Sequence, residues 1–559
     1  MRGILRSVAL GATACVLSAQ TSSLLDILTA ELDRNFKVLK EKGDPAPYFL
    51  AYAVSDTETQ LVSATLGFLE GKSANRSRLL DVTVRVGTPQ LDNYRRLPGD
   101  RPRFSAAVPI PLEDLPAPVR QIAWLETDRT YREAVQRLIR IRTSTQVKPA
   151  EEDPSPDFSI EPPEKYVEPL QPLQFATALW EDRVRKWSAA LGRRREILVS
   201  NVTVFAQRET KYYTTSEGSR LQHGRGLARI VISARGRAAD GMELSVGETF
   251  EAETPERLPP EKTVLEAIER VARNLAALER APEAEPFAGP AILSGRAAGV
   301  FFHEIFGHRI EGHRQKDESE GQTFAKSLGT KVLPEFLSVI FDPTRRSLDG
   351  VDLNGYYLYD DEGVKARPVV VVENGILKTF LMSRSPVRGV ERSNGHGRRQ
   401  PGFEVVSRQS NLIVESSRRV PEKQLRAMLL DEVRRQNKPY GLYFEEVTGG
   451  FTQTARRGLQ AFAVIPILVY RVYPDGRPDE LVRGADIVGT PLASFSKILA
   501  TGDRLEIFNG FCGAESGSVP VAAVAPAILV SEIEIQKREK SQERPPLLPR
   551  PDVESRLFR

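Results

Sequence analysis

Hydrophobic side chains recur every three or four residues in four stretches of the chain, a spacing that places them on one face of a helix. The clearest stretch runs from Ser23 to Lys42 and ends at a Gly-Asp-Pro turn. The same spacing predicts amphipathic helices over residues 121–142, 175–191 and 262–278.

Alternation of apolar and polar side chains predicts strands elsewhere. The turn Glu373-Asn374-Gly375 lies between two apolar runs and predicts a hairpin. The other strands are expected over residues 48–68, 197–206, 227–234, 462–472 and 528–535. This pattern predicts an α+β fold, with an N-terminal α/β domain followed by a β-rich C-terminal domain.

The length of 559 residues predicts more than one domain, because single hydrophobic cores stop growing near ~250–300 residues. A Pro, Glu and Ala-rich stretch around residue 285 marks the expected boundary. The N-terminal domain is expected over residues 20–285 and the C-terminal domain over 286–536. A Pro/Glu-rich insertion at 149–172 is expected to be an exposed loop or linker, and the charged, Pro-rich segment 537–559 a flexible tail.

The first residues resemble a secretory signal peptide. Arg2 and Arg6 precede an apolar run of small side chains that reaches Ala19. We therefore expect residues 1–19 to be removed and the chain to be secreted or periplasmic. Lipidation at Cys15 is a second interpretation, and a frayed amphipathic N-terminus is a third. No later segment is long and apolar enough for a transmembrane helix, which takes ~20 residues.

Charge and cysteine content narrow the choice of function. Lys and Arg total 78 and Asp and Glu total 74, so the chain lacks the basic excess typical of nucleic-acid-binding proteins. The two cysteines are Cys15 and Cys512, and removal of the first 19 residues would leave a single thiol. A lone thiol in an oxidising compartment needs protection by burial or by metal ligation.

Three of the five histidines lie close together, at His303, His308 and His313. The first is followed by Glu304, which gives the pattern His-Glu-x-x-x-His within an apolar segment. In a regular helix, side chains five residues apart point about 140° apart. Both rings reach one divalent metal ion only if the helix widens into a π-type bulge or breaks, and Gly307 gives the backbone that freedom.

A third ligand is expected from Cys512, because glycines on both sides let a loop bring the thiolate to a metal. Zinc accepts mixed nitrogen and sulfur ligands, and hydrolytic zinc sites have three protein ligands and an open position. Glu304 is then placed to act as the catalytic base toward the attacking water. The alternatives are hydrogen-bonded core histidines and a small buried cysteine.

The segment from His303 through Gly312 resembles the metallopeptidase signature of the TldD/PmbA family. The resemblance continues through Asp360-Asp361-Glu362-Gly363, Asn394-Gly395-His396-Gly397 and Gly510-Phe511-Cys512-Gly513 to Ser518-Val519-Pro520, and extends more weakly to Thr215-Ser216-Glu217-Gly218.

The resemblance implies a zinc metallopeptidase that acts on unfolded or extended peptides, usually as a dimer that encloses the active site. It assigns His303, His308 and Cys512 as Zn²⁺ ligands and Glu304 as the base. Family members of the PmbA (TldE) type lack the metal motif and serve as partners, so this chain resembles the catalytic TldD type. It departs from the family at His313, where Asp is usual, and in its signal peptide, since the family is usually cytoplasmic.

Other polar residues have weaker assignments. His396, Arg398 and Arg399 either contact the substrate or form a solvated turn, and Glu311 is expected to orient a ligand ring. The sequence thus predicts a zinc metallopeptidase that works as a homodimer or as a heterodimer with a PmbA-type subunit. The rival functions are a non-catalytic, peptide-binding subunit of such a hetero-oligomer and a metal hydrolase of a non-peptide amide.

Overall fold

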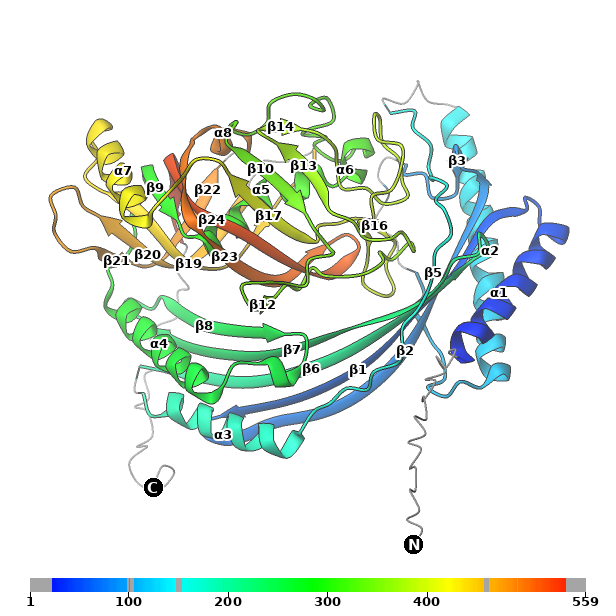
Figure 1. The fold of residues 1–559 in the computed structure, drawn as a ribbon, viewed down its shortest axis with the longest axis horizontal. Coiled ribbons are helices and arrows are strands. Elements are labelled where there is room, and N and C mark those ends of the chain that lie inside the picture. Colours follow the sequence, from blue (N-terminus) through cyan, green and yellow to red (C-terminus); the bar gives the residue numbers. More distant parts are fainter. Residues whose placement is uncertain are drawn as a thin grey trace, which may run out of the picture.

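The computed structural model describes residues 23–97, 100, 105–146, 153–194, 196–456, 462–489 and 491–538. Two β-sheets dominate this part of the chain. Figure 1 shows a long, curved N-terminal sheet with its concave face toward a compact C-terminal body. The fold is α+β, as the sequence predicts.

The N-terminal sheet has the strand order β3-β2-β1-β6-β7-β5, with β4 beside β2 and β8 beside β7. Its pairs are antiparallel except for β5, which runs parallel to β7. Its strands are β1 (Pro47–Thr65), β2 (Phe68–Thr88), β3 (Leu91–Asp92), β4 (Val108–Pro109), β5 (Lys165–Val167), β6 (Val199–Thr215), β7 (Arg220–Arg237) and β8 (Glu243–Ala252).

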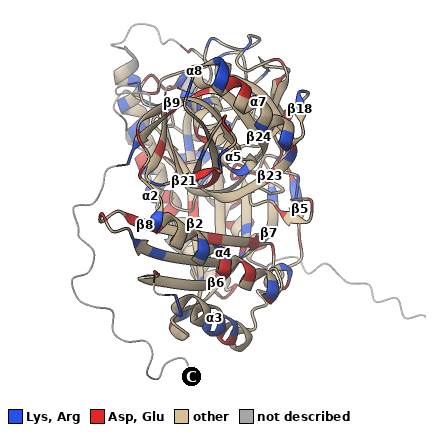
Figure 2. Ribbon diagram, turned by 90° about the vertical axis from the view of Figure 1, so that its left-hand side faces the viewer, with Lys and Arg blue, Asp and Glu red and all other residues tan. Residues whose placement is uncertain are grey.

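Helices cover the convex face of this sheet. The apolar face of each helix packs against the even-numbered side chains of the strands, and both sets are buried as a result. Figure 2 shows charges of both signs interspersed on α3 and α4, which is typical of solvated helix faces. Odd-numbered side chains of β6 and β7 are left to face the C-terminal body. The helices are α1 (Ser23–Lys42), α2 (Pro116–Gln146), α3 (Thr177–Gly192) and α4 (Glu261–Arg280), with the short helix η1 (Pro255–Arg257) before α4.

The C-terminal sheet has 12 strands, with β14-β13-β10-β17-β24-β22-β20-β19-β9 as its main path. An additional pairing of β9 with β24 closes a ring of strands. The main strands are β9 (Phe287–Leu293), β10 (Leu337–Phe341), β13 (Val369–Glu373), β14 (Ile376–Leu377), β17 (Asn411–Ser416), β19 (Gly441–Thr452), β20 (Phe462–Val472), β22 (Ala485–Gly489), β23 (Ile498–Ala514) and β24 (Gly517–Lys537).

Short elements complete this body. They are α5 (Gly295–Ile305), η2 (Gly307–Ile310), α6 (His313–Lys316), β11 (Ser347–Leu348), β12 (Val351–Asp352), β15 (Gly397–Arg398), β16 (Val406–Ser407), β18 (Arg419–Val420), α7 (Glu422–Arg435), β21 (Glu480–Val482) and α8 (Pro491–Ser496).

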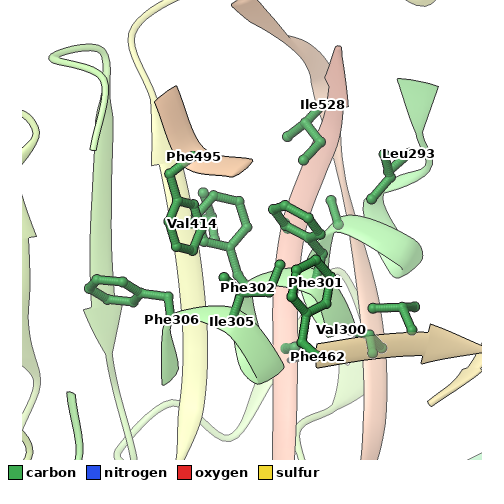
Figure 3. Close-up of a cluster of buried hydrophobic side chains, with 14 of the residues drawn as sticks. Leu293, Val300, Phe301, Phe302, Ile305, Phe306, Val414, Phe462, Phe495 and Ile528 are labelled. Carbon is green, nitrogen blue, oxygen red and sulfur yellow. The ribbon is translucent and has the colours of Figure 1, made fainter. Parts of the chain in front are cut away.

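Helix α5 is buried in the largest hydrophobic core. The side chains of Phe301 and Phe302 lie among residues from several strands and from α8, including Phe462 and Phe495 (Figure 3). Phe301 has no exposed surface. The apolar residues of this segment therefore fix the helix rigidly in the body, and its last turn carries His303 and Glu304.

Most predicted elements are present with shifted ends. The first helix spans Ser23–Lys42 as predicted, and β13 pairs with β14 across the expected hairpin. Asn374 and Gly375 both have positive φ (47° and 79°), the geometry that this turn requires. Strand β24 includes Lys537, the first residue of the expected tail, while residues 539–559 lie outside the described chain.

The boundary between the two domains at residue 285 stays a prediction, as does the signal peptide. Residues 1–19 and Cys15 lie outside the described residues. Within the described chain, no helix has the length and apolarity needed to cross a membrane. Leu468 of β20 packs into the core formed by α3, α4 and the N-terminal sheet, so the two bodies share buried surface.

Residues 153–172 of the predicted insertion are exposed only in part, because residues 157–159 and Glu161 are buried. Phe158 is 3% exposed, and its ring lies between the guanidinium groups of Arg85 and Arg384, each 3.9 Å from the ring centroid. Arg85 belongs to the N-terminal sheet, whereas Arg384 follows β14. The segment therefore straps the two bodies together, because cations on both sides stabilise an aromatic ring.

Polar contacts continue along this strap. Lys316 Nζ donates hydrogen bonds to the carbonyl oxygens of Ser155 and Pro156, each at 2.8 Å. Glu161 pairs with Arg392 at 2.7 Å. The composition predicted an exposed segment, because Pro and Glu rarely form cores. In the structure, backbone carbonyl groups and a carboxylate of this segment instead bind residues of the C-terminal body, which are distant in sequence.

Replacement of Phe158 by Ala should lower the free energy of unfolding by about 3–5 kcal/mol, because it empties a buried aromatic site. Urea denaturation followed by tryptophan fluorescence measures this loss. The matched control is Ile160→Ala in the same strap, where the side chain is 70% exposed and the expected change is within ~0.5 kcal/mol. If the two substitutions changed the free energy of unfolding equally, the buried Phe158 would not stabilise the protein more than an exposed residue of the strap does.

Candidate metal centre

The His-Glu-x-x-x-His motif lies where helix α5 ends. Ser294 caps the start of α5, since its Oγ accepts a hydrogen bond from the Ala297 amide at 3.1 Å. The α-helix stops at Ile305, and a 3₁₀ turn, η2, follows from Gly307 to Ile310. The backbone thus breaks instead of forming the π-type bulge offered as one possibility, and the break turns His308 toward His303.

Gly307 is required at this break by a close approach. A Cβ atom there would overlap the side-chain amide of Gln409, so that buried amide would have to move. Gln409 uses the space to donate a hydrogen bond from Nε2 to the His303 carbonyl oxygen at 3.2 Å. The same amide nitrogen lies 3.4 Å from His303 Nε2. Gly307 therefore lets a neighbouring chain segment hold the end of α5.

Cys512 reaches the histidines from a different part of the sequence. It lies near the end of β23, opposite Val519 of β24. Its Sγ is 3.3 Å from His308 Nε2. One donor atom from each of His303, His308 and Cys512 lies within 4.8 Å of the other two, and all three side chains are buried. Two nitrogens and a sulfur at this spacing fit a zinc ion at about 2.0–2.3 Å from each donor.

A buried carboxylate orients His308. Glu311 has no exposed surface, and its Oε2 lies 3.3 Å from His308 Nδ1. Arg314 donates to the same oxygen at 2.8 Å. This contact holds one ring nitrogen of His308 and leaves Nε2 directed at Cys512, as expected for a residue that orients a metal ligand.

Arg408 connects the carboxylate to the cysteine strand. It is fully buried, donates to the carbonyl oxygen of Cys512 at 2.6 Å, and its Nε lies 3.6 Å from Glu311 Oε1. Sequence reasoning missed both Arg408 and Gln409. The available signal is the polar run 407–411, which would be expected at the surface but is completely buried here. Buried polar runs of this kind must be satisfied by specific partners.

The charges of the cluster shift its pKa values. Burial raises the pKa of Cys512, but the nearby His308, His303 and Arg408 outweigh burial, so the pKa lies well below its usual range. Burial lowers the pKa of His308, yet Cys512 and Glu311 together raise it well above the usual value. Burial also opposes ionisation of Glu311, but His308 and Arg314 lower its pKa to about 2. The cysteine is thus favoured as a thiolate, the form that binds metals.

Glu304 lies beside the cluster without belonging to it. Its Oε2 is 3.9 Å from His308 Nε2. Burial raises the pKa of this carboxyl, although His303 and His308 oppose the shift. Gly450 of β19 packs against it so closely that a Cβ there would lie 2.6 Å from Glu304 Cγ. The side chain is therefore confined next to the donor cluster.

The remaining predicted site residues occupy other surroundings. His313 pairs with Glu515, which also accepts a hydrogen bond from Arg314 at 2.8 Å. His396 has no exposed surface, and its Nε2 lies 3.1 Å from Ser410 Oγ. His396 is thus a buried histidine, and its role toward a substrate stays a prediction.

Arg398 and Arg399 line a cavity of about 310 Å³ between the two bodies. Arg398 donates to the carbonyl oxygen of Gln409 at 2.6 Å, and Arg399 pairs with Asp81 at 3.3 Å. The solvated turn considered for these residues is not what the structure shows, because Arg398 is 5% exposed.

Known proteins resemble this chain in sequence. Residues 288–537 match the PmbA/TldA metallopeptidase C-terminal domain. A metalloprotease of Methanocaldococcus jannaschii is 29% identical over 334 residues, which cover 58% of this chain and 67% of that protein. A zinc metalloprotease TldD homolog of Saccharolobus solfataricus is 26% identical over 250 residues, or 44% of this chain and 51% of that one.

The fold is shared with solved structures. TldE from Thermococcus kodakarensis has a TM-score of 0.61 at 16% identity, covering 90% of this chain and 100% of its own. A Thermotoga maritima protein described as a modulator of DNA gyrase gives the same TM-score at 17% identity, covering 90% of this chain and 99% of its own.

The C-terminal region of this chain therefore matches a family of metallopeptidase domains. Residues 288–537 match the C-terminal domain of the TldD/PmbA family, the family that the sequence motifs predict.

The donor cluster predicts that Cys512→Ser removes the metal, because a neutral hydroxyl replaces a thiolate ligand. Elemental mass spectrometry of purified protein should find about one zinc ion per wild-type chain, as expected for one three-ligand site, and a small fraction of that in the variant. His313→Gln is the control and should keep the metal, since His313 faces Glu515. Loss of metal from His313→Gln but not from Cys512→Ser would contradict the assigned ligands.

Proposed function

We propose that this protein is a zinc metallopeptidase that hydrolyses unfolded or extended peptides. His303, His308 and Cys512 would bind Zn²⁺, and Glu304 would be the catalytic base. The observation that carries this proposal is the convergence of three buried donors within 4.8 Å, with a carboxyl group at their side. Relatives named as metalloproteases support it.

Zinc is the metal that best suits these donors. Thiolate ligands favour Zn²⁺ over Mg²⁺ and Ca²⁺, and imidazole is a common zinc ligand. When bound, zinc supplies a Lewis acid that polarises a carbonyl group and lowers the pKa of water. Glu311 and Arg408 would keep the ligand side chains in place, as their contacts with His308 and Cys512 support.

Glu304 would transfer the proton of the reaction. Its carboxylate accepts a proton from the attacking water and passes it to the amide nitrogen of the leaving group. Burial raises the pKa of Glu304 toward the range in which a carboxyl group both accepts and releases protons. Confinement by Gly450 would limit its motion between the two steps.

Glu304→Gln should retain metal and lose peptide cleavage by at least about 10²–10⁴-fold, because an amide cannot accept the proton. Cleavage of a quenched-fluorescent unstructured peptide, measured together with metal content, tests this. The exposed Glu335→Gln is the control and should cleave at the wild-type rate. Undiminished turnover by metal-loaded Glu304→Gln would remove Glu304 from the role of base.

A second candidate is a non-catalytic, peptide-binding subunit, which the fold likeness to TldE favours. Purified wild type without zinc, even after zinc is supplied, together with peptide binding but no cleavage, would support it. A third candidate is a hydrolase of non-peptide amides, which a panel of peptide and non-peptide amides distinguishes from a peptidase.

We also propose that the protein assembles as a homodimer or as a heterodimer with a PmbA-type subunit. The family resemblance and the likeness to TldE support this assembly. Light scattering of the chain, alone and mixed with such a subunit, discriminates between the two. A monomer under both conditions would reject them.

A secreted or periplasmic location remains our proposal from the sequence of residues 1–19. N-terminal sequencing of the mature chain tests it. A start at Gln20 would support cleavage of a signal peptide, a blocked Cys15 would support lipidation, and retention of Met1 would reject both.

A further inference from the structure

The cavity of about 310 Å³ lies between the concave face of the N-terminal sheet and the C-terminal body. Its walls include Glu209 and Arg225 from β6 and β7, and Tyr357, Arg398 and Val519 from the opposite body. Val519 is the residue paired with Cys512 across the β23–β24 hairpin. The cavity therefore borders the strands that carry a candidate metal ligand.

Two arginines of this cavity lack a carboxylate partner within the described part of the chain. Arg225 donates one hydrogen bond to the carbonyl oxygen of Asn354 at 3.2 Å. Arg398 donates to the Gln409 carbonyl oxygen at 2.6 Å and lies over the Tyr357 ring at 4.7 Å from its centroid. Glu209 is the cross-strand neighbour of Arg225, yet the two side chains do not form an ion pair.

Unpaired guanidinium groups in an enclosed site are costly, because burial removes water without supplying an anion. The pKa of Arg225 is lowered to about 10, first by burial and then by repulsion from Arg398, although Glu209 opposes this shift. Burial also lowers the pKa of Arg398. The other cations of the cavity wall are paired: Lys211 with Asp361, and Arg399 with Asp81. An anionic ligand that bridges Arg225 and Arg398 would relieve this imbalance.

The same cavity exposes an unpaired strand edge. On its outer edge β7 pairs with β5 up to Gln222 and with β8 from Ala228 onward. Residues 223–227 between them have a partner only in β6, within the described chain, and all line the cavity. The gap between β5 and β8 thus faces the cavity, although the Glu253 backbone packs against Gly226.

The direction of the backbone in this gap follows from its neighbours. The Gln222 carbonyl oxygen accepts a hydrogen bond from the Glu168 amide on the outer edge. Backbone groups alternate between the two edges of a strand, so those of Gly224 and Gly226 point to the same outer edge. Their N–H and C=O groups are therefore available to an extended peptide backbone, which is how strands are added to sheet edges.

We propose that this cavity binds the C-terminal segment of an extended peptide, whose backbone pairs with β7 at Gly224 and Gly226 and whose terminal carboxylate is bound by Arg225 and Arg398. A carboxylate matches the guanidinium pair in charge and in hydrogen-bonding geometry. The choice of a peptide as ligand rests on the peptidase function proposed above. The carboxylate site itself rests only on the cavity and its charges.

The first test compares two peptides of identical sequence, one with a free C-terminal carboxylate and one with a C-terminal amide. Binding is measured by fluorescence anisotropy with metal-free wild-type protein, so that the result does not depend on catalysis. The free acid should bind about ten- to a hundredfold more tightly, as expected for charge-assisted hydrogen bonds. Equal affinities would overturn the proposal, whatever the peptidase assay gives.

Variants locate the carboxylate site. Arg225→Gln should remove the preference for the free acid, and Arg225→Lys, which keeps the charge, should restore part of it. The control is Arg235→Gln on the same strand, because Arg235 is outside the cavity and its side chain is 55% exposed. An acid preference that survives Arg225→Gln in a folded protein, with the fold checked by circular dichroism, would overturn the assignment.

A backbone scan of the free-acid peptide tests the strand edge without altering the protein. Methylation of single amide nitrogens should weaken binding at alternate positions near the C-terminus, where N–H groups face β7. Uniform tolerance of methylation would reject strand pairing. Competition by acetate as strong as that by the peptide would also reject it, since only a small anion site would then remain.

Discussion

The carboxylate of Glu311 is the charge on which the candidate metal centre depends. It has no exposed surface, so its ionised form exists only because partners surround it. Those partners come from separate segments: His308 from η2, Arg314 from α6 and Arg408 near β17. Arg408 in turn holds the backbone at Cys512. One buried negative charge thus links the histidine turn to the cysteine strand.

Two close backbone approaches complete this arrangement. Gly307 admits the amide of Gln409, and Gly450 allows β19 to lie against Glu304. At Gly450 a Cβ would meet the Ala463 carbonyl oxygen and Glu304, and at Gly307 it would displace the amide of Gln409, so each glycine sets how closely two segments approach. The geometry of the site therefore depends on these two glycines as well as on the polar groups. The hydrophobic packing around α5 holds the same segment in place.

The sequence predicted much of this from local patterns. Helical spacing located α1 and α4, and the need for two rings to converge predicted either a π-type bulge or a break near Gly307. The support residues were not predictable, because a polar run such as 407–411 normally lies at a surface, and only tertiary packing makes it internal. The same limitation applies to the insertion, where Phe158 is buried between arginines from both bodies. The unpaired edge of β7 likewise depends on where β5 and β8 end, which periodicity does not determine.

The strap also constrains how the chain reaches its final state. Ser159 and Glu161 bond to Arg384, Arg392 and Ser393, more than two hundred residues later in sequence. During synthesis, the N-terminal sheet and its helices emerge long before these partners exist. Contacts of such sequence separation form late and slow folding. The first half of the chain therefore waits for the second with Phe158 only partly covered, a stage at which chaperones have a surface to bind.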